Sequence, residues 1–146
     1  MNNHELESYL APYGTRIICA DELPAVVEKR PVSYVVNTDP CGQPGKHWVA
    51  FHFPEHREIC EFFDSMGQTP QHYHRRFKNV LITNSPGYFY IKDRLQALDS
   101  DVCGQYCIYF VVQRHLGRTM EDICRDFLQY EHDVNDEFVS RYVNHL

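Results

Sequence analysis

A cysteine, a histidine and an aspartate stand in this chain in a setting that suits thiol-based hydrolysis. Cys103 opens an apolar run whose length predicts a buried helix over residues 102–116. A helix N-terminus carries about half a positive charge, which lowers the pKa of a thiol and favours the nucleophilic thiolate. Gly104 follows and leaves the backbone open to a substrate carbonyl, whose oxyanion can be bound by backbone N–H groups. Such a thiolate also needs a histidine that is held by a carboxylate.

A predicted β-hairpin supplies this histidine and this carboxylate. Residues 46–53 and 58–64 are strand-like runs joined by a short polar connection. In a register centred on that connection His47 lies opposite Asp64, with Cβ atoms ~5 Å apart. The same register pairs Val49 with Phe62 and Phe51 with Cys60, and these residues share one apolar face with Phe53. A slip of one residue would lose the pair and turn the apolar side chains to the other face.

The remaining segments predict helices around a central group of strands. Strands are expected over residues 32–37, 80–83 and 88–92, helices over residues 3–10, 119–129 and 133–145, a possible helix over 71–78 and a Pro- and Gly-rich loop over 39–45. We expect an acidic residue or Ser to cap the helix 102–116 and Gly117 to close it, and Thr119 with Asp122 resembles a capping box. This order of elements predicts an α+β fold.

Composition and charge narrow the class of protein. The chain has 146 residues, 43% hydrophobic and 23% charged, which predicts one folded domain over residues 1–146 and excludes extensive disorder. The net charge of −6 does not favour a general affinity for DNA or anionic lipid. No apolar run is long enough to cross a bilayer, and the acidic N-terminus does not resemble a secretory signal. We therefore expect no membrane association.

The six cysteines contain no C-x-x-C motif, and we expect reduced thiols in a cytosolic or nuclear setting. Cys107 lies one helical turn after Cys103 and is either a redox or metal partner or a core residue, and we favour the core residue. His72 and His74 lack a second close pair of ligands, so we expect no metal site. The basic run 71–78 either docks an acidic partner or nucleic acid or is a solvated face, and we favour the solvated face.

Four sequence blocks, in order, resemble the adenovirus-type cysteine proteases (adenain), in the clan of the ubiquitin-like-protein-specific and SUMO-specific proteases. The blocks are VVNTDPCGQPGKHWVAF, EFFDSMG, Gln96 and SDVCGQYC, within residues 33–117. The resemblance implies a papain-like α+β core, with a central mixed β-sheet flanked by helices and the nucleophile at the N-terminus of a buried helix. It also implies that Cys103 is the nucleophile, His47 the general base, Asp64 the residue that orients His47, Gln96 the oxyanion-hole glutamine, and Trp48 and Gly104 substrate-binding residues.

The family cleaves after small residues, typically Gly-Gly or Gly-x-Gly, because its cleft is narrow. The resemblance thus implies a protein substrate with a Gly-rich site, such as a precursor protein of a virus or a self-synthesising DNA transposon. No cysteine lies between Cys60 and Cys103, the interval in which adenain tethers its peptide cofactor, so a peptide activator is not supported. The acidic charge balance does not support a DNA activator either, and we expect no cofactor. We expect a monomer in the cytoplasm or nucleus of a host cell, or packaged in a virion.

Two other functions share these residues. An isopeptidase for ubiquitin-like modifiers would use the same catalytic residues, but it needs a large surface for the folded modifier, and 146 residues limit that surface. A non-catalytic binding module with the same fold would not need the cysteine, histidine and aspartate together. We therefore favour the cysteine endopeptidase.

Overall fold

Short runs of β-branched and aromatic residues form a five-stranded sheet in the computed structural model, which describes residues 1–43, 46–55 and 58–146. The strands are β1 (Arg16–Cys19), β2 (Val32–Asn37), β3 (Trp48–Phe53), β4 (Cys60–Phe63) and β5 (Tyr88–Tyr90), in this order across the sheet. β1 pairs with β2 and β4 with β5 in parallel, whereas β2–β3 and β3–β4 are antiparallel. The sheet is therefore mixed, as predicted.

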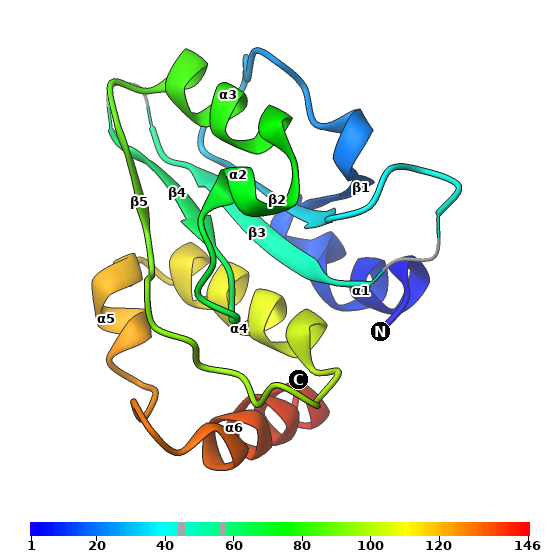
Figure 1. Cartoon of the computed structure of the whole chain (residues 1–146), viewed down its shortest axis with the longest axis vertical. Helices are drawn as coiled ribbons and strands as arrows, with labels where there is room; N and C mark the ends of the chain where they lie inside the picture. Colours follow the sequence, from blue (N-terminus) through cyan, green and yellow to red (C-terminus); the bar gives the residue numbers. More distant parts are fainter. Residues whose placement is uncertain (44–45, 56–57) are drawn as a thin grey trace.

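Helices cover both faces of this sheet (Figure 1). They are α1 (Asn3–Leu10), α2 (Pro70–Tyr73), α3 (Arg75–Asn84), α4 (Cys103–His115), α5 (Met120–Cys124) and α6 (His132–Asn144), with short 3-10 turns at Ala11–Tyr13 and Ala20–Glu22. In Figure 1, α3 lies over one face, α4 lies over the other, and α6 packs on the outer side of α4. The predicted α+β fold is confirmed. No helix in the described part of the chain is long and apolar enough to span a bilayer.

The apolar face predicted for the hairpin forms one of two cores. Phe51 and Phe62 are fully buried and pack against Phe77 of α3, with the rings of Phe51 and Phe77 5.1 Å apart. The opposite face of the sheet is buried as well, because Phe63 stacks on Phe110 of α4 at a ring distance of 4.6 Å. Every residue of β3 is therefore buried, and α4 is held firmly against the sheet.

The predicted hairpin register is wrong by two residues. Phe51 pairs with Phe62 and not with Cys60, and β3 and β4 end before they reach His47 and Asp64. A shift of two residues keeps each side chain on its face, so the apolar pattern alone could not detect the error. Part of the connection on which the prediction centred the turn, residues 56–57, lies outside the described residues.

Three other predictions about elements need correction. Residues 80–83 are not a strand but the second half of α3, because Phe77, Val80 and Leu81 form the helix face that covers the sheet. The helix predicted to reach residue 129 ends at Cys124, because the side chain of Asn135 binds both backbone groups of Leu128. Among the described residues no side chain caps α4, although Gly117, with a φ of +91°, closes it as predicted.

The prediction that all six cysteines are reduced thiols is also wrong, because Cys19 and Cys41 form a disulfide. Cys19 ends β1, and the parallel pairing of β1 with β2 brings it level with Asn37, from which the chain continues to Cys41. The backbone N–H of Ala20 donates to Asp39, and the two cysteine Cα atoms lie 5.2 Å apart. The pairing depends on strand topology, which cysteine spacing alone does not reveal.

Candidate active site

The carboxylate of Asp64 is the most firmly held group of the site. Asp64 directly follows β4 and is 1% exposed. Its oxygens accept hydrogen bonds from the backbone N–H groups of Met66 and Gln68, both at 3.0 Å, and from the Tyr73 hydroxyl at 2.7 Å. These donors fix the carboxylate in one orientation, with one oxygen turned toward His47.

His47 directly precedes β3 and meets this carboxylate, with Nε2 2.6 Å from Asp64 Oδ1. Because Nε2 is engaged by Asp64, the other ring nitrogen is left for the interaction of His47 with Cys103. Burial alone would lower the pKa of His47, but hydrogen bonds to Asp64 and Cys103 and their negative charges raise it to about 9. The imidazole is therefore held in its protonated form at neutral pH.

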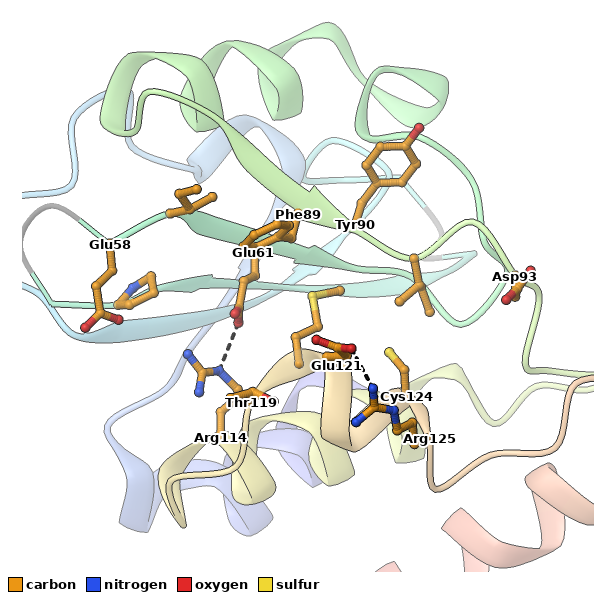
Figure 2. A pocket seen from close by; sticks show the side chains of 14 residues that line it. Glu58, Glu61, Phe89, Tyr90, Asp93, Arg114, Thr119, Glu121, Cys124 and Arg125 are labelled. Atoms are coloured by element: carbon orange, nitrogen blue, oxygen red, sulfur yellow. Dashed lines mark hydrogen bonds and ion pairs between the residues drawn. The ribbon is translucent and has the colours of Figure 1, made fainter.

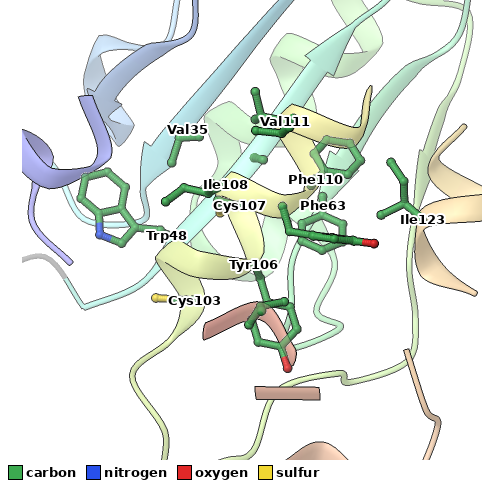
Figure 3. Close-up of a cluster of buried hydrophobic side chains, with 14 of the residues drawn as sticks. Val35, Trp48, Phe63, Cys103, Tyr106, Cys107, Ile108, Phe110, Val111 and Ile123 are labelled. Atoms are coloured by element: carbon green, nitrogen blue, oxygen red, sulfur yellow. The ribbon is translucent and has the colours of Figure 1, made fainter. Parts of the chain in front are cut away.

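Cys103 is the first residue of α4, where Figure 3 shows its sulfur close to Trp48. Burial alone would raise the pKa of Cys103, but the hydrogen bond and positive charge of His47, together with a hydrogen bond from the Trp48 backbone, lower it. The other free thiols behave differently, because burial raises the pKa of Cys60, Cys107 and Cys124. Cys107 lies in the core beneath Cys103, as we favoured.

Gln96 lies on the segment between β5 and α4 and is 2% exposed. Its Oε1 accepts from the Ser65 hydroxyl at 2.7 Å, and its Nε2 donates to the carbonyl and hydroxyl oxygens of Ser100 at 3.0 and 3.1 Å. Gln96 and Cys103 line the same cavity. The amide is therefore placed beside the thiol with its N–H groups turned toward the residues that lead into α4.

A close approach of two backbones brings Gln96 to the Asp64 turn. The backbone N–H groups of Leu95 and Gln96 both donate to the Ser65 carbonyl, at 2.8 and 3.1 Å. Gly67 closes the turn with a φ of +72°, and a Cβ built on it would lie 2.8 Å from the backbone of Asp93 and Arg94. Only glycine fits at this position, which gives a physical reason for the Gly that ends the EFFDSMG block.

The cavity above Cys103 has a volume of about 480 Å³. Its lining comprises Met1, Lys46, His47, Trp48, Met66, Gln68, His72, Tyr73, Gln96, Leu98, Ser100, Asp101 and Cys103. Trp48 is among the lining residues, although it is largely buried and its indole N–H donates to the Met1 carbonyl at 3.0 Å. Gly104 does not line this cavity, because the Met1 side chain packs over it, and a Cβ on Gly104 would lie 3.0 Å from the Cβ of Met1.

The family model of the adenovirus endoprotease matches residues 18–121, a span that contains His47, Asp64, Gln96 and Cys103. The chain belongs to the adenovirus endoprotease family. A candidate thiol protease, R355, of Acanthamoeba polyphaga mimivirus is 28% identical over 112 residues, which are 68% of this chain and 35% of that protein. The crystal structure of the ASFV pS273R protease superposes with a TM-score of 0.60 at 19% identity and covers 94% of this chain and 65% of that one.

This member of the adenovirus endoprotease family therefore shares the fold of the pS273R protease. It spans about a third of the length of the mimivirus relative and about two thirds of the length of pS273R.

Two residues that contact the site were missed by the sequence analysis. Tyr73 was placed in a solvated basic run, yet its hydroxyl binds Asp64 and its ring lies 5.4 Å from that of His47. Ser65 is adjacent to Asp64 but carried no signal of its own, because its partner Gln96 is distant in the sequence. The turn after Asp64 brings these groups together through backbone hydrogen bonds, which no spacing of residue types in the sequence reveals.

A second and larger cavity, of about 940 Å³, lies between the β4–β5 edge and α5 (Figure 2). Its lining includes Phe89, Met120 and the ion pair between Arg114 and Glu61, whose Nε and Oε1 lie 2.9 Å apart. Its lining contains none of the candidate catalytic residues. In the described part of the chain, one group of possible metal ligands, Cys19, Glu22 and Cys41, lies within 4.8 Å, but its two sulfurs form the disulfide.

Proposed function

We propose that this chain is a cysteine endopeptidase in which Cys103 is the nucleophile, His47 the general acid and base, and Asp64 the residue that orients the imidazole. The observation that carries the proposal is the position of His47, whose Nε2 lies 2.6 Å from Asp64 Oδ1 and which lines the same cavity as Cys103. A thiolate at a helix N-terminus, paired with an imidazolium, is the usual nucleophile of cysteine proteases. Membership of the adenovirus endoprotease family supports the same activity.

The proposed reaction follows from this arrangement. The Cys103 thiolate attacks the scissile carbonyl, and the negative charge that develops on the carbonyl oxygen is bound by Gln96 Nε2 and by backbone N–H groups at the start of α4. The imidazolium of His47 then gives its proton to the leaving amine, and the acyl group remains on the sulfur. Neutral His47 next takes a proton from water, the hydroxide attacks the thioester, and the thiolate is released.

We further propose that the substrate is a precursor polypeptide cleaved after a Gly-containing motif. The cavity beside Cys103 is small, and Trp48 and Leu98 narrow it with large side chains. A glycine at the reacting position would bring the substrate backbone close to the sulfur without a side chain to accommodate. The matching relatives named as proteases are viral, which supports a precursor protein of a virus or virus-like element as the substrate.

A hydrolysis assay tests the proposal directly. A fluorogenic Gly-x-Gly peptide should be turned over by the wild-type chain and not by Cys103→Ala, while Cys124→Ala, which removes a thiol distant from the cavity, should retain full activity. Equal turnover by Cys103→Ala would contradict the assignment of the nucleophile. A ubiquitin-like fluorogenic substrate cleaved in preference to the peptide would favour an isopeptidase.

A further inference from the structure

The side-chain amide of Gln96 is held at both ends by serine residues. The Ser65 hydroxyl donates to Oε1 at 2.7 Å, and Nε2 donates to the backbone carbonyl of Ser100 at 3.0 Å and to its hydroxyl at 3.1 Å. Gln96 and Ser65 are each 2% exposed, so water does not compete for these bonds. The amide is therefore confined to one orientation before any substrate binds.

The chemistry of these partners decides which end of the amide faces Ser100. A backbone carbonyl can only accept a hydrogen bond, so the amide atom beside the Ser100 carbonyl must be the nitrogen. A flipped amide would place Oε1 against that carbonyl and leave two acceptors facing each other. The Ser65 hydroxyl completes the arrangement because it can donate to Oε1. Gln96, Ser100 and Cys103 line the same cavity, so this orientation turns the N–H groups toward a residue of the cavity that holds the nucleophile.

We propose that Ser65 is a positioning residue for Gln96, and that its hydroxyl holds Oε1 so that an Nε2 hydrogen is directed at the carbonyl oxygen of a bound substrate. This inference rests on the proposed function. When the oxyanion forms, it replaces the Ser100 hydroxyl as the acceptor of one Nε2 hydrogen, while that hydroxyl keeps its own bond to the Ala97 carbonyl at 3.2 Å. The bond to the Ser100 carbonyl and the bond from Ser65 are retained.

One short turn would then position two different catalytic groups. Asp64 orients His47, and its neighbour Ser65 holds the Gln96 side chain through its hydroxyl and the Leu95–Gln96 backbone through its carbonyl. The imidazole of His47 and the amide of Gln96 are thus both held by the Asp64–Ser65 turn, and the start of α4 supplies the sulfur of Cys103. Because positioning errors of about 1 Å can cost a hundredfold in rate, such a shared frame has a clear mechanistic use.

The test uses Ser65→Ala in the wild-type chain and in a Gln96→Ala background, with the Gly-x-Gly peptide as substrate. Loss of an oxyanion donor lowers kcat about 10²–10³-fold, so loosening it through Ser65→Ala should lower kcat by less, about tenfold, with little change in KM. In the Gln96→Ala background Ser65→Ala should cause no further loss, because the group through which it acts is gone. Ser85→Ala is the matched control, since it removes another buried serine hydroxyl, bound to the Cys60 N–H at 3.1 Å.

A second readout separates Ser65 from its neighbour Asp64. Alkylation of Cys103 by iodoacetamide is a displacement at a saturated carbon and forms no oxyanion, so Ser65→Ala should leave its rate unchanged. Ser65→Thr keeps the hydroxyl and should retain most of kcat even where the alanine variant fails to fold.

Several results would overturn the inference. They are an unchanged kcat in Ser65→Ala, an equal loss in both backgrounds, slowed alkylation, or a Ser65→Thr variant as slow as Gln96→Ala. Each of these leaves the proposed function standing as long as the wild-type chain shows Cys103-dependent turnover. Absence of that turnover would instead overturn the proposed function, and the role of Ser65 with it.

Discussion

The ionisation of Cys103 and His47 determines the pH range in which this site holds a thiolate and an imidazolium. Burial opposes charge on both groups, but each charged form stabilises the other, and Asp64 adds a second negative partner for the imidazole. The pKa of Cys103 is lowered and that of His47 is raised to about 9. Between these two values the pair exists as thiolate and imidazolium, and its protons are lost as a coupled system.

We predict that iodoacetamide alkylates Cys103 rapidly at about pH 6–7, where an ordinary thiol is almost fully protonated. The rate should fall on acidification, because the thiolate is lost below the lowered pKa of Cys103. Peptide hydrolysis should also decline above pH 9, because His47 then lacks the proton that it gives to the leaving amine.

Mass spectrometry of the alkylated chain from pH 4 to 10 measures this dependence. Cys124 is an internal control, because burial raises its pKa to about 12 and it should remain unmodified at neutral pH. In His47→Ala the burial of Cys103 is no longer opposed by the imidazolium, so alkylation at about pH 6–7 should become slow. A reaction that is equally fast in His47→Ala would show that the imidazole does not ionise the thiol.

At the scale of elements, the segments with a strong local pattern were predicted well. The expected helix 102–116 differs from α4 by one residue at each end, because an apolar run of that length closed by glycine leaves few alternatives. Residues 80–83 were predicted as a strand because all four are β-branched or leucine. In the structure Val80 and Leu81 are buried in one cluster with Phe51 and Phe62, whereas Ile82 and Thr83 are exposed, which is the pattern of a helix that covers the sheet with one face. Tertiary contacts determine the secondary structure of that segment, and local propensity alone does not predict it.

For the candidate site, the sequence indicated which residues to consider but not the geometry of their contacts. His47 and Asp64 were named from a predicted hairpin and Gln96 from the resemblance to the adenain blocks, but the contact of His47 with Asp64 does not come from the strand register that suggested it. Both residues lie just beyond the strands, where the Asp64 turn and its N–H donors decide the geometry. Such donors carry no sequence signature, because every residue except proline has a backbone N–H.

Gly67 offers a test of that turn. We predict that Gly67→Ala destabilises the fold and lowers kcat, because its Cβ would lie 2.8 Å from the backbone of Asp93 and Arg94 and would push the Gln96 segment away from Asp64. A left-handed φ costs an alanine about 1–2 kcal/mol, and the clash adds to this cost. The measurements are urea unfolding and peptide hydrolysis.

Gly14 is the matched control for this substitution, since it has a φ of +67° and a Cβ placed on it would meet nothing within 4 Å. Gly14→Ala should therefore lose only the conformational part, about 1–2 kcal/mol, and keep full activity. Equal losses of stability and activity in the two variants would mean that the close approach at Gly67 does not hold the site together.

At the scale of the whole molecule, the site joins two layers. His47 and Asp64 extend from the sheet, whereas Cys103 begins the helix that packs on one face of it (Figure 3). The contact between thiol and imidazole therefore exists only while α4 is docked, and the stacking of Phe63 on Phe110 is part of that docking. Reactivity of Cys103 at neutral pH thus reports on the packing of the fold as well as on its own neighbours.

The Cys19–Cys41 disulfide should contribute to the stability of the whole fold but not to the geometry of the active site. It bridges 22 residues and ties the end of β1 to the loop that leads toward His47. We predict that Cys41→Ser lowers the free energy of unfolding by about 3 kcal/mol, the chain-entropy value for a loop of this length. Alkylation of Cys103 should nevertheless stay fast, because the Thr38 N–H donates to the His47 carbonyl at 2.9 Å and holds the histidine independently of the bridge.

Urea unfolding of wild type and Cys41→Ser, each with and without dithiothreitol, measures the loss of stability, and the reductant should destabilise only the wild type. A Cys41→Ser variant that keeps its stability but loses rapid alkylation would reverse this assignment and make the disulfide a support of the active site.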